Sequence, residues 1–116
     1  MTTTRNRPIS SVEIESELVR IVNDIEAETE AFEELAKDHA RKEALYKAAW
    51  YKEYLSAEGP IKNKESIAGH KTMSQYYESM VAEAMVKAKR EKLHSLRTAC
   101  DALRTLSANV RSQVKY

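Results

Sequence analysis

Apolar residues recur at steps of three and four through most of the chain, which is the spacing of one face of an α-helix. In the first half this pattern skips only Glu28 and Lys42. Its positions are Ile14, Leu18, Ile21, Ile25, Phe32, Leu35, His39 and Tyr46. We expect this stripe to pack against a neighbouring helix.

Toward the middle of the chain the apolar face becomes wider. A second register at the same spacing comprises Ala44, Ala48, Tyr51 and Leu55, while Leu45, Ala49 and Trp50 broaden the face further. A helix that is apolar over more of its circumference is buried on more than one side. We therefore predict more than one packing neighbour for this segment.

The second half of the chain carries another helical stripe. Its first part comprises Ile67, His70, Met73, Tyr77, Met80, Ala84 and Ala88. After a small phase slip it continues through Leu93, Leu96, Cys100, Leu103, Leu106, Val110 and Val114. Between the halves, Gly59 and Pro60 form a strong helix stop. The pattern predicts helices over about residues 11–57 and 61–114, with a turn at 59–60.

The start of the first helix is marked by Ser10 and Glu13, which have capping-box spacing. Residues 1–9 are polar, and we expect a flexible tail there. The predicted organisation is thus a tail over 1–9 and a single helical domain over 10–116.

Two helices joined by one short turn lie antiparallel, as in an αα-hairpin. This register places Trp50 beside Gly69, which has room for an indole, and Phe32 near Ala88. A two-helix hairpin leaves apolar positions uncovered on both arms. The predicted fold is therefore all-α, two long antiparallel helices assembled into a dimeric four-helix bundle or coiled coil.

The composition of this 116-residue chain indicates what kind of protein it encodes. Apolar residues make up 42% and charged residues 32%, which is typical of a helical protein and argues against disorder. No apolar run approaches the roughly 18–20 residues that span a bilayer. Residues 1–7 lack the apolar segment of a secretory signal, and Cys100 is the single cysteine. We expect a cytoplasmic protein.

Charge is distributed unevenly between the two halves. Residues 1–58 carry 8 Lys or Arg and 13 Asp or Glu, a net charge of −5, whereas residues 59–116 carry 11 and 5, a net charge of +6. In an antiparallel hairpin the acidic arm lies beside the basic arm. The basic residues are then neutralised within the chain.

Signals for catalysis are weak. Glu91 and His94 have the i, i+3 spacing of di-iron bundles, but a second such motif is missing and chance is the better explanation in a Glu-rich chain. His39 and His70 lie on apolar faces, where core or interface histidines are the default. With two glycines there is no phosphate-binding loop. We predict no enzyme, no cofactor, no metal site and no small-molecule substrate.

Two sets of residues are candidates for binding. At the turn, aromatic residues interleaved with lysines can form a protein contact or stack nucleic-acid bases. This set comprises Tyr51, Tyr54, Lys52, Lys62 and Lys64. The basic second helix could hold DNA phosphates. That set comprises Lys87, Lys89, Arg90, Arg97 and Arg104.

Three segments resemble small helical proteins of tailed bacteriophages that infect Gram-positive and actinobacterial hosts. They are residues 54–59 (Tyr-Leu-Ser-Ala-Glu-Gly), 62–68 (Lys-Asn-Lys-Glu-Ser-Ile-Ala) and 103–111 (Leu-Arg-Thr-Leu-Ser-Ala-Asn-Val-Arg). The resemblance covers roughly residues 40–112. It implies a protein of the host-cell cytoplasm, encoded near genes for DNA metabolism, and it supplies no catalytic residue. Pro60 departs from the Thr-like cap expected of such relatives.

These observations favour a non-enzymatic, homo-oligomeric interaction protein, with a dimer as the expected oligomer. Its partner would be a phage recombination or replication component or a host protein. One alternative is a DNA-binding accessory protein that uses the basic helix or the Lys/Tyr-rich turn. Another is a scaffold or chaperone of virion assembly. No membrane association is expected.

Overall fold

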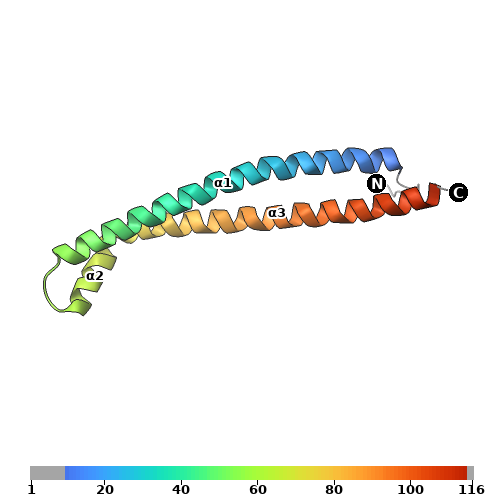
Figure 1. Ribbon diagram of the computed structural model, residues 1–116. Coiled ribbons are helices and arrows are strands. Elements are labelled where there is room, and N and C mark those ends of the chain that lie inside the picture. The colour runs from blue at the N-terminus through green and yellow to red at the C-terminus, as the bar shows by residue number, and fades with distance from the viewer. Residues whose placement is uncertain (1–9, 115–116) are drawn as a thin grey trace, which may run out of the picture. The chain divides into compact units, whose positions relative to one another are not determined.

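The computed structural model describes residues 10–114, and every regular element in this range is a helix. Helix α1 spans Ser11–Ser56, α2 spans Ile61–Lys71 and α3 spans Met73–Val114 (Figure 1). The all-helical class is therefore confirmed. The tail predicted for residues 1–9 lies outside the described residues.

The first turn of α1 has the capping box that the sequence predicts. The Glu13 N–H donates to Ser10 Oγ at 3.1 Å, and the Ser10 N–H donates to Glu13 Oε1 at 3.0 Å. Each residue thus satisfies a backbone donor at the helix end, where intrahelical acceptors are missing.

The turn between α1 and α2 lies where Gly59 and Pro60 predict it. Gly59 has φ 107°, in the left-handed region that favours glycine. Pro60 is extended, with φ −64° and ψ 158°, and its carbonyl accepts from the N–H groups of Asn63 and Lys64. The chain thus leaves α1 through a glycine and enters α2 after a proline.

The single helix predicted over residues 61–114 is wrong, because the chain breaks at Thr72. This residue has φ −112° and ψ 17°, outside the helical range. Its side chain is buried, and the hydroxyl donates to the Ala68 carbonyl at 2.7 Å. The Thr72 N–H donates to the same carbonyl at 3.2 Å, and the Tyr76 N–H donates to the Thr72 carbonyl at 3.0 Å. The break therefore lies in the backbone dihedrals of Thr72, which separate a short α2 from α3.

The described chain divides into two compact units, and each contains a stretch of α1 and a stretch of α3. Among the described residues, unit 1 comprises 10–29 with 91–114, and unit 2 is Glu30–Arg90. In each unit the α1 stretch runs antiparallel to the α3 stretch (Figure 1).

In unit 1 the buried faces of α1 and α3 pack against each other, as the sequence predicts. We call this line of buried positions the seam. Ile14 and Ile21 of α1 are buried, as are Leu93 and Cys100 of α3. Beside this seam, Lys92 Nζ of α3 lies 3.3 Å from Glu28 Oε1 of α1. Aliphatic burial at seven-residue intervals on both helices is the pattern of antiparallel coiled-coil packing.

In unit 2 the α1 seam continues without drift. The half-buried positions along it are Phe32, Leu35, His39, Lys42, Tyr46, Ala49 and Glu53. Tyr46 contacts Tyr76 of α3 with ring centroids 5.2 Å apart, and the Arg90 guanidinium lies 5.8 Å from the Phe32 ring centroid. These pairs lie a few residues further along α3 than the predicted register. The second register on α1, through Tyr51 and Leu55, is exposed instead of packed.

The predicted stripe on the first part of α3 faces the wrong way. Met73, Tyr77 and Met80 are exposed. The residues buried there instead are Thr72, Ser79, Ala82 and Val86. Most of these side chains are small, whereas the half-buried positions of α1 in this unit include Phe32, Leu35 and Tyr46. A prediction that buries the face with the larger apolar side chains is therefore wrong for this part of α3.

One predicted contact is wrong, and the predicted pairing of the acidic and basic arms is confirmed only in part. A Cβ placed on Gly69 would meet no described atom within 4 Å, so the Trp50 indole does not pack against this glycine. The acidic and basic arms are joined at Lys92 and Glu28 and at Lys71 and Glu53, 3.6 Å apart. Most other ion pairs lie within one helix, among them Arg20–Glu17, Arg41–Asp38, Lys87–Glu83 and Arg104–Asp101.

Candidate interaction surface

The outer side of α3 in unit 2 carries an apolar stripe, which we call the α3 stripe. It comprises Met73, Tyr77, Met80, Ala84 and Ala88, all exposed. Tyr77 is 68% exposed and Met73 is 62% exposed. Steps of three and four keep these residues on one side of the helix, and a turn of 100° per residue places them opposite the buried Ser79, Ala82 and Val86.

Further apolar side chains border the α3 stripe. Tyr76, Val81 and Met85 are each exposed by 40% or more. Large exposed apolar patches on a protein surface mark interaction sites more often than isolated exposed residues do. The α3 stripe and these neighbours thus form a surface suited to packing against another helix.

Helix α1 has an outer stripe of its own in unit 2, which we call the α1 stripe. Its members are Ala44, Ala48, Tyr51 and Leu55, all exposed. Tyr51 is 60% exposed and Leu55 is 77% exposed. The α1 stripe lies opposite the α1 seam at Tyr46, Ala49 and Glu53. The widened apolar face seen in the sequence is therefore a second surface, and the described chain does not cover it.

The outer side of α3 in unit 1 has a different character. At the positions that continue the same three-and-four spacing, the residues are Glu91, Ser95, Thr98, Ala102, Thr105 and Asn109, and all are exposed. Polar side chains on the solvent side are the ordinary condition of a two-helix pair. The outer side of α3 is thus apolar in unit 2 and polar in unit 1.

The residues predicted at the turn separate into two groups. Tyr54 stacks on Trp50 with ring centroids 5.2 Å apart and an interplanar angle of 15°, and Lys64 Nζ of α2 lies 5.4 Å from the Tyr54 ring centroid. Cation–π contact therefore ties α2 to α1 through Tyr54. Tyr51 meets the edge of Trp50 and stays exposed, as do Lys52 and Lys62.

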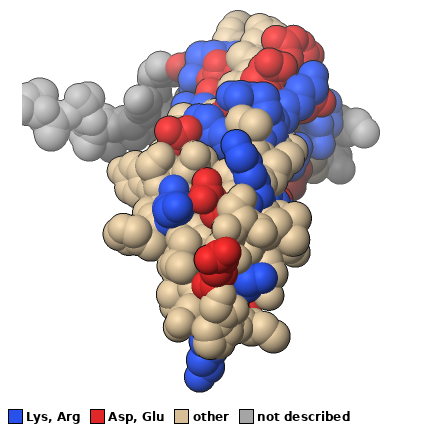
Figure 2. All heavy atoms as spheres, turned by 90° about the vertical axis from the view of Figure 1, so that its left-hand side faces the viewer, with Lys and Arg blue, Asp and Glu red and all other residues tan. Residues whose placement is uncertain are grey.

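Charged residues near the turn are scattered. In Figure 2 the α1–α2 turn faces the viewer, and much of the surface around it is neither acidic nor basic, with single charges set apart from one another. Basic side chains therefore do not gather into one patch around the turn on this face.

The five basic residues predicted as a DNA contact do not form one surface. Lys89 is half-buried at a seam position, and Arg90 lies over the Phe32 ring. Lys87 pairs with Glu83, and Arg104 pairs with Asp101. Arg97 is exposed. Seven-residue spacing places Arg90, Arg97 and Arg104 on one side of α3, whereas a turn of 100° per residue places Lys87 and Lys89 on other sides, so the five residues are not presented together to a phosphate backbone.

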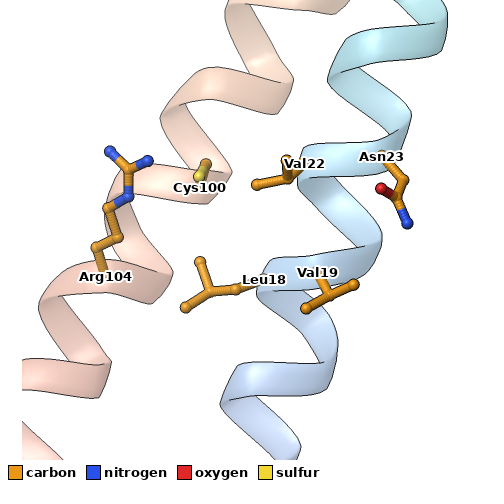
Figure 3. A pocket seen from close by; sticks show the side chains of 6 residues that line it. All are labelled: Leu18, Val19, Val22, Asn23, Cys100 and Arg104. Atoms are coloured by element: carbon orange, nitrogen blue, oxygen red, sulfur yellow. The ribbon is translucent and has the colours of Figure 1, made fainter.

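A shallow groove of about 260 Å³ lies between the two helices of unit 1 (Figure 3). Leu18 and Val22 point from α1 toward Cys100 on α3, and Arg104 lies at the edge of the groove. Its volume is below the roughly 300–1,000 Å³ of typical ligand pockets. The groove is therefore a weaker candidate than the stripes of unit 2.

Over residues 10–114 no group of three or more His, Cys, Asp and Glu residues could hold a metal ion, and both Glu91 and His94 are exposed. None of the described helices is both long and apolar enough to cross a membrane. Comparison with protein-family models, with curated proteins and with solved structures gave no match.

The sequence pattern predicts that the α3 stripe packs against α1, whereas the structure exposes it. A signal that could have corrected this is the seven-residue series Thr72, Ser79, Val86, Leu93 and Cys100. This series is continuous with the correctly predicted seam of unit 1 and needs no phase slip. Constancy of register along α3 was therefore a better guide than local hydrophobicity.

Proposed function

We propose that the protein is a non-enzymatic, homo-oligomeric interaction protein that binds a macromolecular partner through the outer surfaces of unit 2. The observation that carries this proposal is the exposed apolar stripe on each helix, opposite its seam. The α1 and α3 stripes consist of Met, Tyr, Leu and Ala side chains, which bind by packing. Burying such surface stabilises a complex by about 25 cal/mol per Å².

The kind of partner is proposed from the resemblance of residues 54–59, 62–68 and 103–111 to small phage proteins. On that basis the partner is a phage recombination or replication component or a host protein, met in the cytoplasm of the bacterial host. An aromatic residue at the centre of an exposed patch is a frequent hot spot of protein interfaces. Tyr51 on α1 has this position.

The test is affinity purification of the tagged chain from phage-infected cells, with mass spectrometry of the captured proteins. We expect a partner that the wild-type chain retains and that Tyr51→Glu loses. The matched control is Ala102→Glu, which places the same charge on the polar outer side of α3 and should retain the partner. Equal capture by all three chains would contradict the use of the α1 stripe. A monomer in light scattering at micromolar concentration would contradict the oligomeric part of the proposal.

Direct DNA binding is the alternative function, and a separate measurement distinguishes it. If the basic residues of α3 bind phosphates, affinity for DNA falls steeply as salt is raised. A gel-shift assay with single- and double-stranded DNA at low salt measures this. The scattered positions of Lys87, Lys89 and Arg90 lead us to expect no shift at micromolar protein.

A further inference from the structure

We propose that the α3 stripe is occupied by the same stripe of a second copy of this chain, in antiparallel orientation about a two-fold axis between Met80 and Val81. This inference rests on the proposed function, because it assumes that the chain associates through unit 2. In this arrangement the two outer surfaces bind different partners. The α3 stripe joins two copies, and the α1 stripe is left for another macromolecule.

The order of side-chain sizes along the α3 stripe carries the inference. The half nearer the turn holds Met73 and Tyr77, and the other half holds Ala84 and Ala88. An antiparallel pair centred between Met80 and Val81 places Met73 opposite Ala88 of the second copy and Tyr77 opposite Ala84. Large residues then fill the space that alanines leave, as close packing requires. The surface is thus complementary to itself in this orientation.

A parallel pair would be less well matched. It would place Met73 and Tyr77 against their own copies and leave the alanines of both chains facing one another across a gap. In the antiparallel pair Lys87, which is exposed at the border of the stripe, lies on the same flank of the interface as the exposed Tyr76 of the second copy, where cation–π attraction is favourable. Shape complementarity and this contact therefore both favour the antiparallel pair.

The available area is sufficient for a specific dimer. The α3 stripe and its borders comprise six large apolar residues: Met73, Tyr76, Tyr77, Met80, Val81 and Met85. With about 200 Å² for a whole side chain, their exposed fractions amount to roughly 600 Å² per copy. Two copies would bury roughly 1,200 Å², at the lower end of the range for specific interfaces. The α1 stripe is shorter and has two large residues, Tyr51 and Leu55.

The first experiment measures self-association by sedimentation velocity over a range of concentrations. The wild-type chain should be a dimer, and Tyr77→Glu should raise the dimer dissociation constant at least about tenfold, because a two-fold interface contains the change twice. Tyr51→Glu is the matched control: it replaces a similarly exposed tyrosine on the α1 stripe and should leave the dimer unchanged. Circular dichroism of each variant verifies that the helices are retained.

The second experiment determines orientation by disulfide cross-linking in a Cys100→Ala background. Met80→Cys lies next to the proposed axis and should cross-link to itself. Met73→Cys should not, because 15 residues at 1.5 Å separate the two copies by about 22 Å along the antiparallel pair. A mixture of Met73→Cys and Ala88→Cys chains should give a mixed disulfide dimer.

The outcomes distinguish a failure of the antiparallel α3 interface from a failure of the proposed function. If the chain is a dimer but Tyr77→Glu has no effect, or if Met73→Cys cross-links efficiently to itself, the antiparallel α3 interface is wrong and the interaction function stands. If the wild-type chain is a monomer throughout, the self-association in both proposals is wrong. A dimer that Tyr77→Glu dissociates, with Met80→Cys self-linked and Met73→Cys linked only to Ala88→Cys, supports the inference.

Discussion

At the scale of single residues, the two glycines of the chain have opposite roles. Gly59 has φ 107°, whereas Gly69 lies within α2 with open space where a Cβ would stand. Gly59→Ala should lower the free energy of unfolding by about 1–2 kcal/mol, since the left-handed region strains an L-residue. Gly69→Ala should raise it by about 0.5–1 kcal/mol through helix propensity. Urea denaturation of both variants measures this, and shifts of the same sign would contradict the assigned backbone roles.

Asp38 provides a pH dependence at the residue scale. Hydrogen bonds from Lys42 and Arg41 lower the pKa of the Asp38 carboxyl below its ordinary value of 3.8. Because the folded-state pKa is the lower one, the stabilisation is complete above that ordinary value and is lost as pH falls through the folded-state pKa. An NMR titration of the carboxyl carbon should show this pKa rise more in Lys42→Gln than in Arg41→Gln. An Asp38 pKa at or above 3.8 in the wild-type chain would contradict this account.

Local signals predicted the ends of elements well. The capping box of Ser10 and Glu13 and the turn at Gly59 and Pro60 depend on neighbouring residues alone, so the sequence contains all that determines them. The break at Thr72 was missed, although threonine is a weak helix former that bonds back to earlier carbonyls. Because many threonines do this inside regular helices, as Thr105 does, the residue type alone does not predict a break.

At the scale of elements, the sequence predicted one face of α1 and about half of the face of α3. Periodicity identifies faces but does not say which of two faces is buried. On the unit 2 part of α3, one face holds large apolar residues and the other holds Ser79, Ala82 and Val86, so hydrophobicity favoured the wrong face. Which face of α3 is buried depends on how this helix pairs with α1, where Phe32 meets Arg90 and Tyr46 meets Tyr76. The pattern within α3 alone does not contain this information.

Two valines of α3 test which face is buried. Val86 is 6% exposed and Val81 is 40% exposed. Val86→Ala should lower the free energy of unfolding by about 1.5 kcal/mol, the value for removing two buried methyl groups, and Val81→Ala by a few tenths. Chemical denaturation at concentrations where the chain is monomeric provides the measurement. A larger loss for Val81→Ala would restore the face that the sequence predicted.

The break at Thr72 can be tested with a second threonine as control. Thr72→Val keeps the β-branched shape and removes the hydroxyl that donates to the Ala68 carbonyl. We expect a loss of about 1 kcal/mol in the free energy of unfolding and Cα chemical shifts of residues 70–74 closer to helical values. Thr105→Val removes a comparable bond to Asp101 inside α3 and should change neither. Unchanged shifts in Thr72→Val would show that the backbone, and not the hydroxyl, causes the break.

At the scale of the whole molecule, the two units contrast in how they bury apolar surface. Unit 1 places Leu93 and Leu96 of α3 toward α1, and the outer side of its α3 stretch is polar. Unit 2 places Ser79 and Ala82 toward α1 and leaves Met73, Met80 and Tyr77 outside. Less apolar area is therefore removed from water on the α3 side of unit 2. We infer that unit 2 gains stability from association, whereas unit 1 does not require it.

Hydrogen exchange measured by mass spectrometry tests this contrast. In dilute protein, amides of residues 79–86 should exchange faster than those of residues 93–100, because local opening exposes less buried apolar surface in unit 2. Raising the concentration should slow exchange over 79–86 through mass action and leave 93–100 unchanged. Tyr77→Glu should abolish this concentration dependence, whereas Tyr51→Glu should preserve it. Equal protection of both segments at every concentration would mean that the small-residue seam of unit 2 is sufficient by itself, and that the exposed apolar stripe of α3 has no part in holding the fold.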